Sequence, residues 1–340
     1  MLIFRSIPDY DPPYRPASLD VSGTQSRVLL IWDSMVTAMQ ASKPENAAVA
    51  SPSFGTGLKV HVGDALQGPR LVNSASLRTE YIDSLRTVWM RMNYVGRACF
   101  TPDLMKDVRL QQHLVASSSQ EVDFLVVASE MPGVFNLGGD LDLFRRMVIA
   151  RDRENLLAYA TDCVEGIYFA IDACRSGIVT IALVEGEALG GGLECALSCD
   201  IVVAERGVKM GFPEMMFSMF PGLGAYPLIL RRAAPHIADA LITGAQIVTS
   251  ERLHELGLID HLAEPGQGER VVRRLIAQIK SRHNGYVGYL RAKRHSPYAI
   301  QYEELIRQTE EWVDCALGIS DRDLRLMELL VESQDRRRVA

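Results

Sequence analysis

Short runs of apolar, β-branched residues alternate with helix-like segments through the middle of this 340-residue chain. The runs VDFLVVAS, IVTIALV and DIVVAE have the length and composition of buried strands. Between the first two, apolar residues of the segment 154–175 recur at the i, i+3, i+4 and i+7 spacing of an amphipathic helix. A shorter helical segment, LECALS, separates the last two runs. This alternation predicts an α/β fold whose strands are joined by helical crossovers.

The two ends of the chain differ from this middle part. Clusters of Pro, Ser and Gly interrupt residues 1–74, which we expect to form an N-terminal extension with little regular structure. Residues 75–262 are predicted to form the core; within it 79–93 fits either a strand pair or a helix, and TPDLMKDVRLQQHLV fits a helix capped by Thr101. The patterns become mostly helical beyond Ser250, so residues 263–340 are predicted to form a helical C-terminal region.

The charge balance excludes one broad class of function. Lys and Arg number 36 and Asp and Glu 42, which gives a net charge of −6, whereas nucleic-acid-binding domains are usually basic. The longest apolar runs fall well short of the roughly 20 residues that a membrane helix needs, and the N-terminal sequence does not resemble a secretory signal. We therefore expect a soluble, cytoplasmic protein.

The metal-binding and redox-active residue types show no site-like spacing. Six cysteines without a CxxC pair and seven scattered histidines match neither a disulfide framework nor a zinc site. We expect the cysteines to be reduced core residues, and we expect neither a metal nor a cofactor.

Three consecutive glycines, Gly190–Gly192, separate the strand IVTIALV from the helix LECALS. Glycine permits a positive φ and lets a ligand approach the main chain. Because the first N–H groups of a helix are unpaired and favour negative charge, this loop could bind a phosphate or stabilise an enolate oxygen. The glycines taken alone are explained at least as well by a tight turn between strand and helix.

Two carboxylates lie in largely apolar surroundings. Glu194 falls in the first turn after the glycines, and Glu214 follows twenty residues later in KMGFPEMMFSMF. Acids in apolar surroundings have raised pKa values, which suits them to general acid and base catalysis. A purely structural role for Glu194 at the helix N-terminus is the alternative.

A second glycine-containing loop, VFNLGGDL, follows the strand VDFLVVAS. Gly138 and Gly139 could place another backbone N–H opposite the first loop, and two such groups from separate loops form an oxyanion hole for a thioester. Asp140 could instead act as the cap of the next helix.

These motifs, in this order, resemble the crotonase (enoyl-CoA hydratase/isomerase) superfamily over roughly residues 79–340. Within it, the phrases VFNLGGDLDLF, GEALGGGLECALSCDIVVAE, MGFPEMMFSMFPGLGAY and TEEWVDCAL are most similar to the diffusible signal factor synthases. Those bacterial enzymes make cis-2-unsaturated fatty acids for quorum sensing. The resemblance implies a crotonase-like spiral of ββα turns with a helical C-terminal region, usually assembled as a homotrimer or hexamer.

The resemblance also implies roles for individual residues. Glu194 and Glu214 match the catalytic glutamates, without assigning which is the acid and which the base. Gly191 matches one oxyanion donor, and Leu137, with Gly138 next to it, matches the other.

Substrate contacts are expected from the glycine loop and from the apolar stretch around the second glutamate. Methionine adapts to irregular apolar ligands, so this stretch could line an acyl-chain tunnel, although ordinary core packing is an equal alternative. The expected contact residues are Gly190, Met215, Phe217 and Met219.

The implied activity is dehydration of a 3-hydroxyacyl chain carried by acyl carrier protein, followed by hydrolysis of the thioester to a free cis-2-unsaturated acid. A CoA-dependent enoyl hydratase or isomerase is the first alternative, although CFTPDLMKDVRLQQHL lacks the LNRP…NAL segment of ordinary CoA-using members. A non-catalytic protein that binds a partner such as a sensor kinase is the second, and the paired carboxylates argue against it. Arginines that could dock an acidic carrier, or simply form a solvated helix face, are Arg145, Arg146, Arg151 and Arg153.

We predict that deletion of residues 1–70 leaves the rest of the protein folded, because this segment contains few uninterrupted apolar elements. The truncated protein should be soluble and should show a single cooperative thermal transition by circular dichroism. Loss of that transition would show that the extension is part of the core.

Overall fold

The computed structural model describes residues 68–118, 121–296 and 299–339. Most of the predicted extension, residues 1–74, lies outside the described residues. None of the helices in the described ranges is long and apolar enough to cross a membrane.

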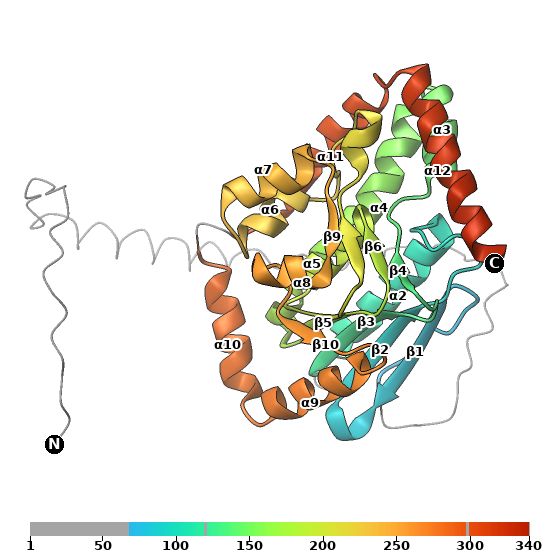
Figure 1. The fold of residues 1–340 in the computed structure, drawn as a ribbon. Coiled ribbons are helices and arrows are strands. Elements are labelled where there is room, and N and C mark those ends of the chain that lie inside the picture. The colour runs from blue at the N-terminus through green and yellow to red at the C-terminus, as the bar shows by residue number, and fades with distance from the viewer. Residues whose placement is uncertain (1–67, 119–120, 297–298, 340) are drawn as a thin grey trace, which may run out of the picture. The chain divides into compact units, whose positions relative to one another are not determined.

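A six-stranded sheet forms the base of the fold (Figure 1). Its strand order is β1-β2-β3-β5-β7-β10, with β1 antiparallel to β2 and all other neighbours parallel. The strands are β1 (Leu77–Ile82), β2 (Thr87–Met92), β3 (Phe124–Ser129), β5 (Val179–Val184), β7 (Ile201–Glu205) and β10 (His261–Ala263). The three apolar runs of the sequence are therefore strands of one mainly parallel sheet, as predicted, and segment 79–93 is the strand pair rather than the helix.

A smaller sheet of four short strands, in the order β4-β6-β8-β9, continues from the large one. Its strands are β4 (Val134–Asn136), β6 (Glu187–Leu189), β8 (Lys209–Gly211) and β9 (Ile247–Thr249). After each of β3, β5 and β7 the chain enters the next strand of the small sheet, and helical structure follows. This repeat is the spiral of ββα turns, and it confirms the predicted fold class. Three-residue strands are too short to show a period in the sequence, and this is why none of them was predicted.

The helices begin and end close to their predicted positions. Thr101 Oγ1 accepts the Leu104 N–H at 3.2 Å, and Asp140 Oδ1 accepts the Asp142 N–H at 3.1 Å, so both expected caps are present. Up to the last strand of the large sheet the helices are α2 (Pro102–Ser117), α3 (Leu141–Ile149), α4 (Arg153–Asp172), α5 (Gly191–Ser198), α6 (Ala225–Leu230), α7 (Pro235–Thr243) and α8 (Ser250–Glu255). Short 3₁₀ turns are η1 (Asp83–Leu85), η2 (Ala173–Ser176) and η3 (Glu214–Phe217).

Both faces of the large sheet are covered, which explains why its central strands are apolar throughout. Along β3, Leu125 and Val127 pack into the cluster that contains the inner helices α2, α4 and α5, while Phe124 and Val126 point to the opposite face. Helices α9 (Gly268–Lys280) and α10 (His283–Lys293) cover that opposite face, below the sheet in Figure 1. The alternation of side chains along a strand thus supplies two separate cores.

The last two helices, α11 (Tyr302–Ala316) and α12 (Asp321–Val339), pack on the other side of the molecule, against α4 and α3 respectively (Figure 1). They share an apolar cluster with α3 and η3 that includes Phe144, Phe217 and Met327. The predicted helical C-terminal region is therefore helical, but its two halves lie against different parts of the core.

Candidate active site

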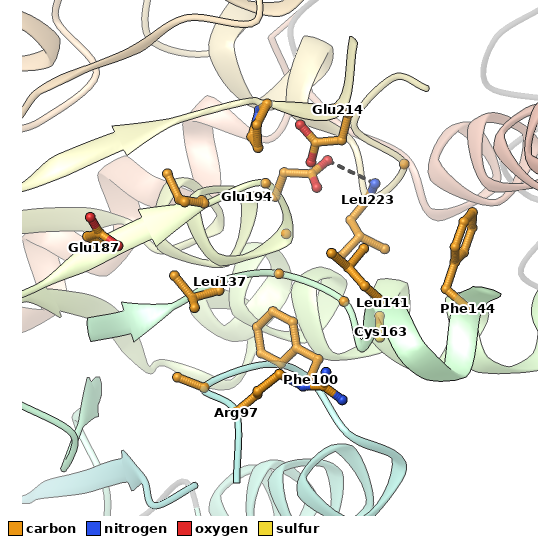
Figure 2. A pocket seen from close by; sticks show the side chains of 18 of the residues that line it. Arg97, Phe100, Leu137, Leu141, Phe144, Cys163, Glu187, Glu194, Glu214 and Leu223 are labelled. Atoms are coloured by element: carbon orange, nitrogen blue, oxygen red, sulfur yellow. Dashed lines mark hydrogen bonds between the residues drawn. The ribbon is translucent and has the colours of Figure 1, made fainter. Parts of the chain in front are cut away.

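A cavity of about 760 Å³ opens where the small sheet meets the inner helices. Its wall is built by the loop after β4, by the start of α5, by η3 and by the C-terminal helices α11 and α12. Figure 2 shows the two predicted catalytic glutamates next to each other on one wall, with Leu137 and Phe100 across from them.

Glu194 is fixed in the first turn of α5 and is only 1% exposed. Its Oε1 accepts the backbone N–H of Leu223 at 2.8 Å and that of Ala225 at 2.9 Å. Both donors belong to the loop PGLGA, which leads into α6, so a helix start is directed at this carboxyl group. A buried carboxyl group with two backbone donors cannot rotate freely.

Glu214 begins η3 and has the opposite environment. Its Oε2 is shielded from solvent and makes no hydrogen bond with any described residue. A β-carbon on Gly190, whose φ is +52°, would lie 2.2 Å from Glu214 Oε1, so any side chain there would displace the carboxyl group. The first glycine of the GGG motif is therefore needed to seat the second glutamate.

The electrostatics of the pair suit proton transfer near neutral pH. Burial, and then the nearby charge of Glu214, raise the pKa of Glu194 to about 8, although its two backbone donors act in the opposite direction. Burial raises the pKa of Glu214 to about 7. Two acids that titrate near pH 7 can hold a proton on one and a charge on the other, as a general acid and base require.

The structure corrects the prediction that Leu137 and Gly138 supply oxyanion donors. The Leu137 N–H donates to the Ala98 carbonyl at 2.7 Å, and the Gly138 N–H donates to Asn136 Oδ1 at 2.7 Å. Both N–H groups are thus committed within the protein, and the prediction is wrong for these two residues.

The next N–H along this loop belongs to Gly139, the other glycine that the sequence offered. Within the described ranges, neither the Gly139 N–H nor the Gly191 N–H makes a hydrogen bond. Gly191 begins α5, so its N–H has no partner within the helix. Both glycines line the cavity, and a β-carbon on Gly138 would lie 3.2 Å from Gly191 N, which shows how closely the two loops approach. Gly139 and Gly191 are the pair of donors that the geometry supports.

Most of the expected substrate contacts lie at the cavity. Gly190, Phe217 and Met219 line it, whereas Met215 does not and its side chain is exposed. Met216 borders the cavity instead, although its side chain is also exposed. In the tight η3 turn successive side chains point in different directions, so only one of these two exposed methionines reaches the cavity.

Several cavity residues carried no signal in the sequence. Phe144, Tyr159, Trp312 and Met327 line the cavity from α3, α4, α11 and α12. In the sequence they are ordinary members of apolar helix faces, and only the packing of the last two helices against α3 and α4 brings them together.

The predictions for cysteines and metals concern the rest of the described structure. All six cysteines are free. Cys99, Cys163, Cys174 and Cys199 are buried, which confirms the prediction for these four, whereas Cys195 and Cys315 are half-buried. No group of three or more His, Cys, Asp or Glu side chains in the described ranges could hold a metal ion.

Comparisons with known proteins agree with this geometry. The family described as enoyl-CoA hydratase/isomerase matches residues 99–311. The human mitochondrial methylglutaconyl-CoA hydratase is 33% identical over 161 residues, which are 47% of this chain and 45% of that protein. The 2,3-dehydroadipyl-CoA hydratase of Escherichia coli is 28% identical over 46% of this chain and 56% of its own length. The chain spans about half the length of the curated relatives it matches.

Solved structures share the fold. DspI of Pseudomonas aeruginosa is 25% identical, with a TM-score of 0.54 over 62% of this chain and 76% of its own. An enoyl-CoA hydratase from Bacillus halodurans, 20% identical, gives a TM-score of 0.62 over 76% of this chain and 99% of its own.

We predict that the two glutamates make the protein less stable as pH rises. In the unfolded chain a glutamate ionises near pH 4.3, whereas in the fold Glu194 and Glu214 keep their protons to about pH 8 and about pH 7. Their favourable contribution is therefore complete below about pH 4.3 and is lost as pH rises through 7 to 8.

Replacement of Glu214 by Gln removes the loss of stability that ionisation of Glu214 causes at high pH. The measurement is the Tm of Glu214→Gln minus the Tm of wild type at the same pH. This difference should be larger at pH 8.5 than at pH 5 by at least about 2 °C, since 1 kcal/mol corresponds to roughly 2–4 °C in a domain of this size. The control is Glu154→Gln, at an exposed glutamate at the start of α4. A Tm difference that stays constant with pH in both variants would contradict the raised pKa.

Proposed function

The chain belongs to the enoyl-CoA hydratase/isomerase family, and from this premise we propose that it dehydrates a 3-hydroxyacyl thioester in the cytoplasm and then hydrolyses the product to a free cis-2-unsaturated fatty acid. The observation that carries the proposal is that one cavity holds both a pair of buried acids and a pair of backbone N–H groups. Glu194 and Glu214 share one wall, and the two loops beside them carry the N–H groups of Gly139 and Gly191, which have no acceptor within the described part of the chain.

The dehydration needs one carboxylate and one carboxylic acid. The carboxylate removes a proton from C2, and the electron pair moves into the thioester carbonyl to give an enolate. The N–H groups of Gly139 and Gly191 hold the enolate oxygen. When the enolate collapses to a C2–C3 double bond, the carboxylic acid protonates the 3-hydroxyl, and the C3–O bond breaks with loss of water.

The hydrolysis uses the same groups. A carboxylate takes a proton from a water molecule, which attacks the thioester carbonyl, and the same two N–H groups hold the tetrahedral oxyanion. The C–S bond then breaks, the sulfur leaves as a thiol after accepting a proton, and the free acid is released. Two acids that titrate near neutral pH can exchange roles between these two steps.

Three observations support a fatty acyl substrate of the signal-synthase type. The signature phrases of the diffusible signal factor synthases surround both glutamates, and DspI is among the similar structures. The cavity also ends in an apolar cluster, lined by Phe144, Phe217, Trp312 and Met327, which suits an aliphatic chain.

A CoA-dependent hydratase is the second candidate, because the curated relatives are hydratases of CoA thioesters by name. Lys209, exposed at the start of β8, also lines the cavity and is the type of group that a CoA phosphate binds. The family's usual assembly further leads us to expect a homotrimer or hexamer.

We predict that Glu194→Gln and Glu214→Gln each lower the rate of dehydration by about 10²-fold or more, the usual scale for loss of a general acid or base. Turnover of a 3-hydroxyacyl thioester is measured by loss or gain of enoyl absorbance, with Glu154→Gln as the matched control. Near-normal turnover in either cavity variant would show that the assigned mechanism is wrong.

The products separate the two candidates. Mass spectrometry of a host that lacks the protein should show a free cis-2-unsaturated acid when wild type is expressed, and none with either glutamate variant. If the purified protein only interconverts enoyl and 3-hydroxyacyl thioesters, the hydratase is the correct function.

The carrier protein remains part of the proposal, with fewer docking residues than the sequence suggested. Arg145 pairs with Glu328 at 3.1 Å and Arg153 pairs with Asp314 at 2.8 Å, so these two arginines connect helices of the same chain. Arg146 and Arg151 are exposed and remain candidates to contact an acidic carrier.

We predict that the double variant Arg146→Glu/Arg151→Glu raises KM severalfold for a substrate on acyl carrier protein and leaves KM for the same chain on CoA unchanged. The effect should be largest at low salt, because exposed charges are screened beyond about 10 Å at 0.1 M. Arg78→Glu, at an exposed position on β1, is the control. Equal or better kcat/KM with CoA in the wild type would contradict a preference for the carrier protein.

A further inference from the structure

The loop that carries the Gly139 N–H is held by hydrogen bonds at almost every residue. Leu137 N–H donates to the Ala98 carbonyl at 2.7 Å, and the Phe100 N–H donates to the Gly138 carbonyl at 2.8 Å. These bonds pair the loop with the segment before α2. They leave the far end of the loop, where Gly139 meets Asp140, to be fixed by other groups.

A tyrosine hydroxyl on α4 supplies that fixation. Tyr159 Oη donates to the Phe100 carbonyl and accepts the Asp140 N–H at 3.0 Å. One hydroxyl therefore joins the segment before α2, at Phe100, to the end of the loop, at Asp140. A β-carbon on Gly139 would lie 3.5 Å from this oxygen, so the hydroxyl lies directly against Gly139, which lines the cavity.

The near end of the loop is fixed by a separate pair. Asn136 Oδ1 accepts the Gly138 N–H at 2.7 Å, and its amide donates to Tyr94 Oη at 3.0 Å. Asn136 is fully buried, and Tyr94 in turn donates to the Phe135 carbonyl. Because this pair acts before Gly139, it cannot replace the contact that Tyr159 makes after it.

We propose that Tyr159 is a positioning residue that aims the Gly139 N–H at the thioester oxygen. This inference rests on the proposed function, since it assigns Tyr159 a part in the same oxyanion hole. The hydroxyl donates its only proton to Phe100 and accepts from Asp140, so it acts through the loop rather than on the substrate.

The consequence for activity follows from the geometry. Tyr159→Phe keeps the ring in the cavity wall but leaves the Phe100 carbonyl and the Asp140 N–H without their shared partner. The side chain of Asp140 still caps α3 and lies 3.8 Å from Arg97, but the backbone at Gly139 loses the hydroxyl that ties it to Phe100. A displacement of about 1 Å at a positioned group can cost up to 10²-fold in rate. We expect kcat to fall about tenfold or more, with KM changed by less than about threefold.

The test compares Tyr159→Phe with Tyr168→Phe. Tyr168 lies on the same helix, α4, and packs its ring against Tyr302 rather than against the loop. Besides kcat and KM, each protein is mixed with a 2,4-dienoyl thioester, whose absorbance moves to longer wavelength when hydrogen bonds polarise its carbonyl. This spectral shift reports the oxyanion hole directly, and a change of stability alone does not alter it.

We expect wild type and Tyr168→Phe to give the full spectral shift and Tyr159→Phe a clearly smaller one at saturating ligand. A full shift with unchanged kcat in Tyr159→Phe would overturn the positioning role. If wild type itself neither polarises the dienoyl thioester nor turns over a 3-hydroxyacyl thioester, the proposed function fails, and this result is distinct from the first.

Discussion

The site depends on the burial of Glu194 beside a second acid. Its Oε1 is held by the N–H groups of Leu223 and Ala225, so the loop before α6 must end where α5 begins. Burial would otherwise make an ionised carboxyl costly. The two donors offset part of that cost and fix the position of the group. Glu214 Oε2 has no donor among the residues that the structure describes, which keeps the second acid available to exchange a proton. The pair therefore combines one anchored carboxyl with one that has an unused oxygen.

The spiral explains how segments far apart in the sequence meet at this pair. The strands β4, β6 and β8 are neighbours in the small sheet, and each belongs to a successive turn. The first is followed by the loop with Gly139, the second by Gly191 and Glu194, and the third by Glu214. Neighbouring parallel strands end at the same edge of a sheet, so three adjacent turns deliver the two N–H donors and the two acids to one place. Glycine at position 192 completes the contact, because a β-carbon there would lie 2.1 Å from the Asn136 carbonyl oxygen.

Much of this arrangement could be predicted from the sequence where the signal is local. The apolar runs, the caps Thr101 and Asp140, and two acids in apolar surroundings all depend on neighbours within a few residues. The errors arise where the deciding contact is distant. The Leu137 N–H is consumed by Ala98, nearly forty positions away, and no pattern within VFNLGGDL shows this. The three-residue strands, and the contact of Met216 rather than Met215 with the cavity, depend likewise on how the turns pack.

The C-terminal helices show most clearly how the site extends beyond its motifs. Helices α9 and α10 cover the far face of the large sheet and contribute to its second core, away from the acids. Helices α11 and α12 place Trp312 and Met327 in the cavity wall, more than ninety residues after Glu214. They are tied to α4 and α3 by the Arg153–Asp314 and Arg145–Glu328 pairs, and exposed pairs of this kind contribute little to stability. The apolar cluster around Phe144 must therefore supply most of the free energy that attaches α11 and α12 to the core. The same apolar contacts also form part of the cavity wall.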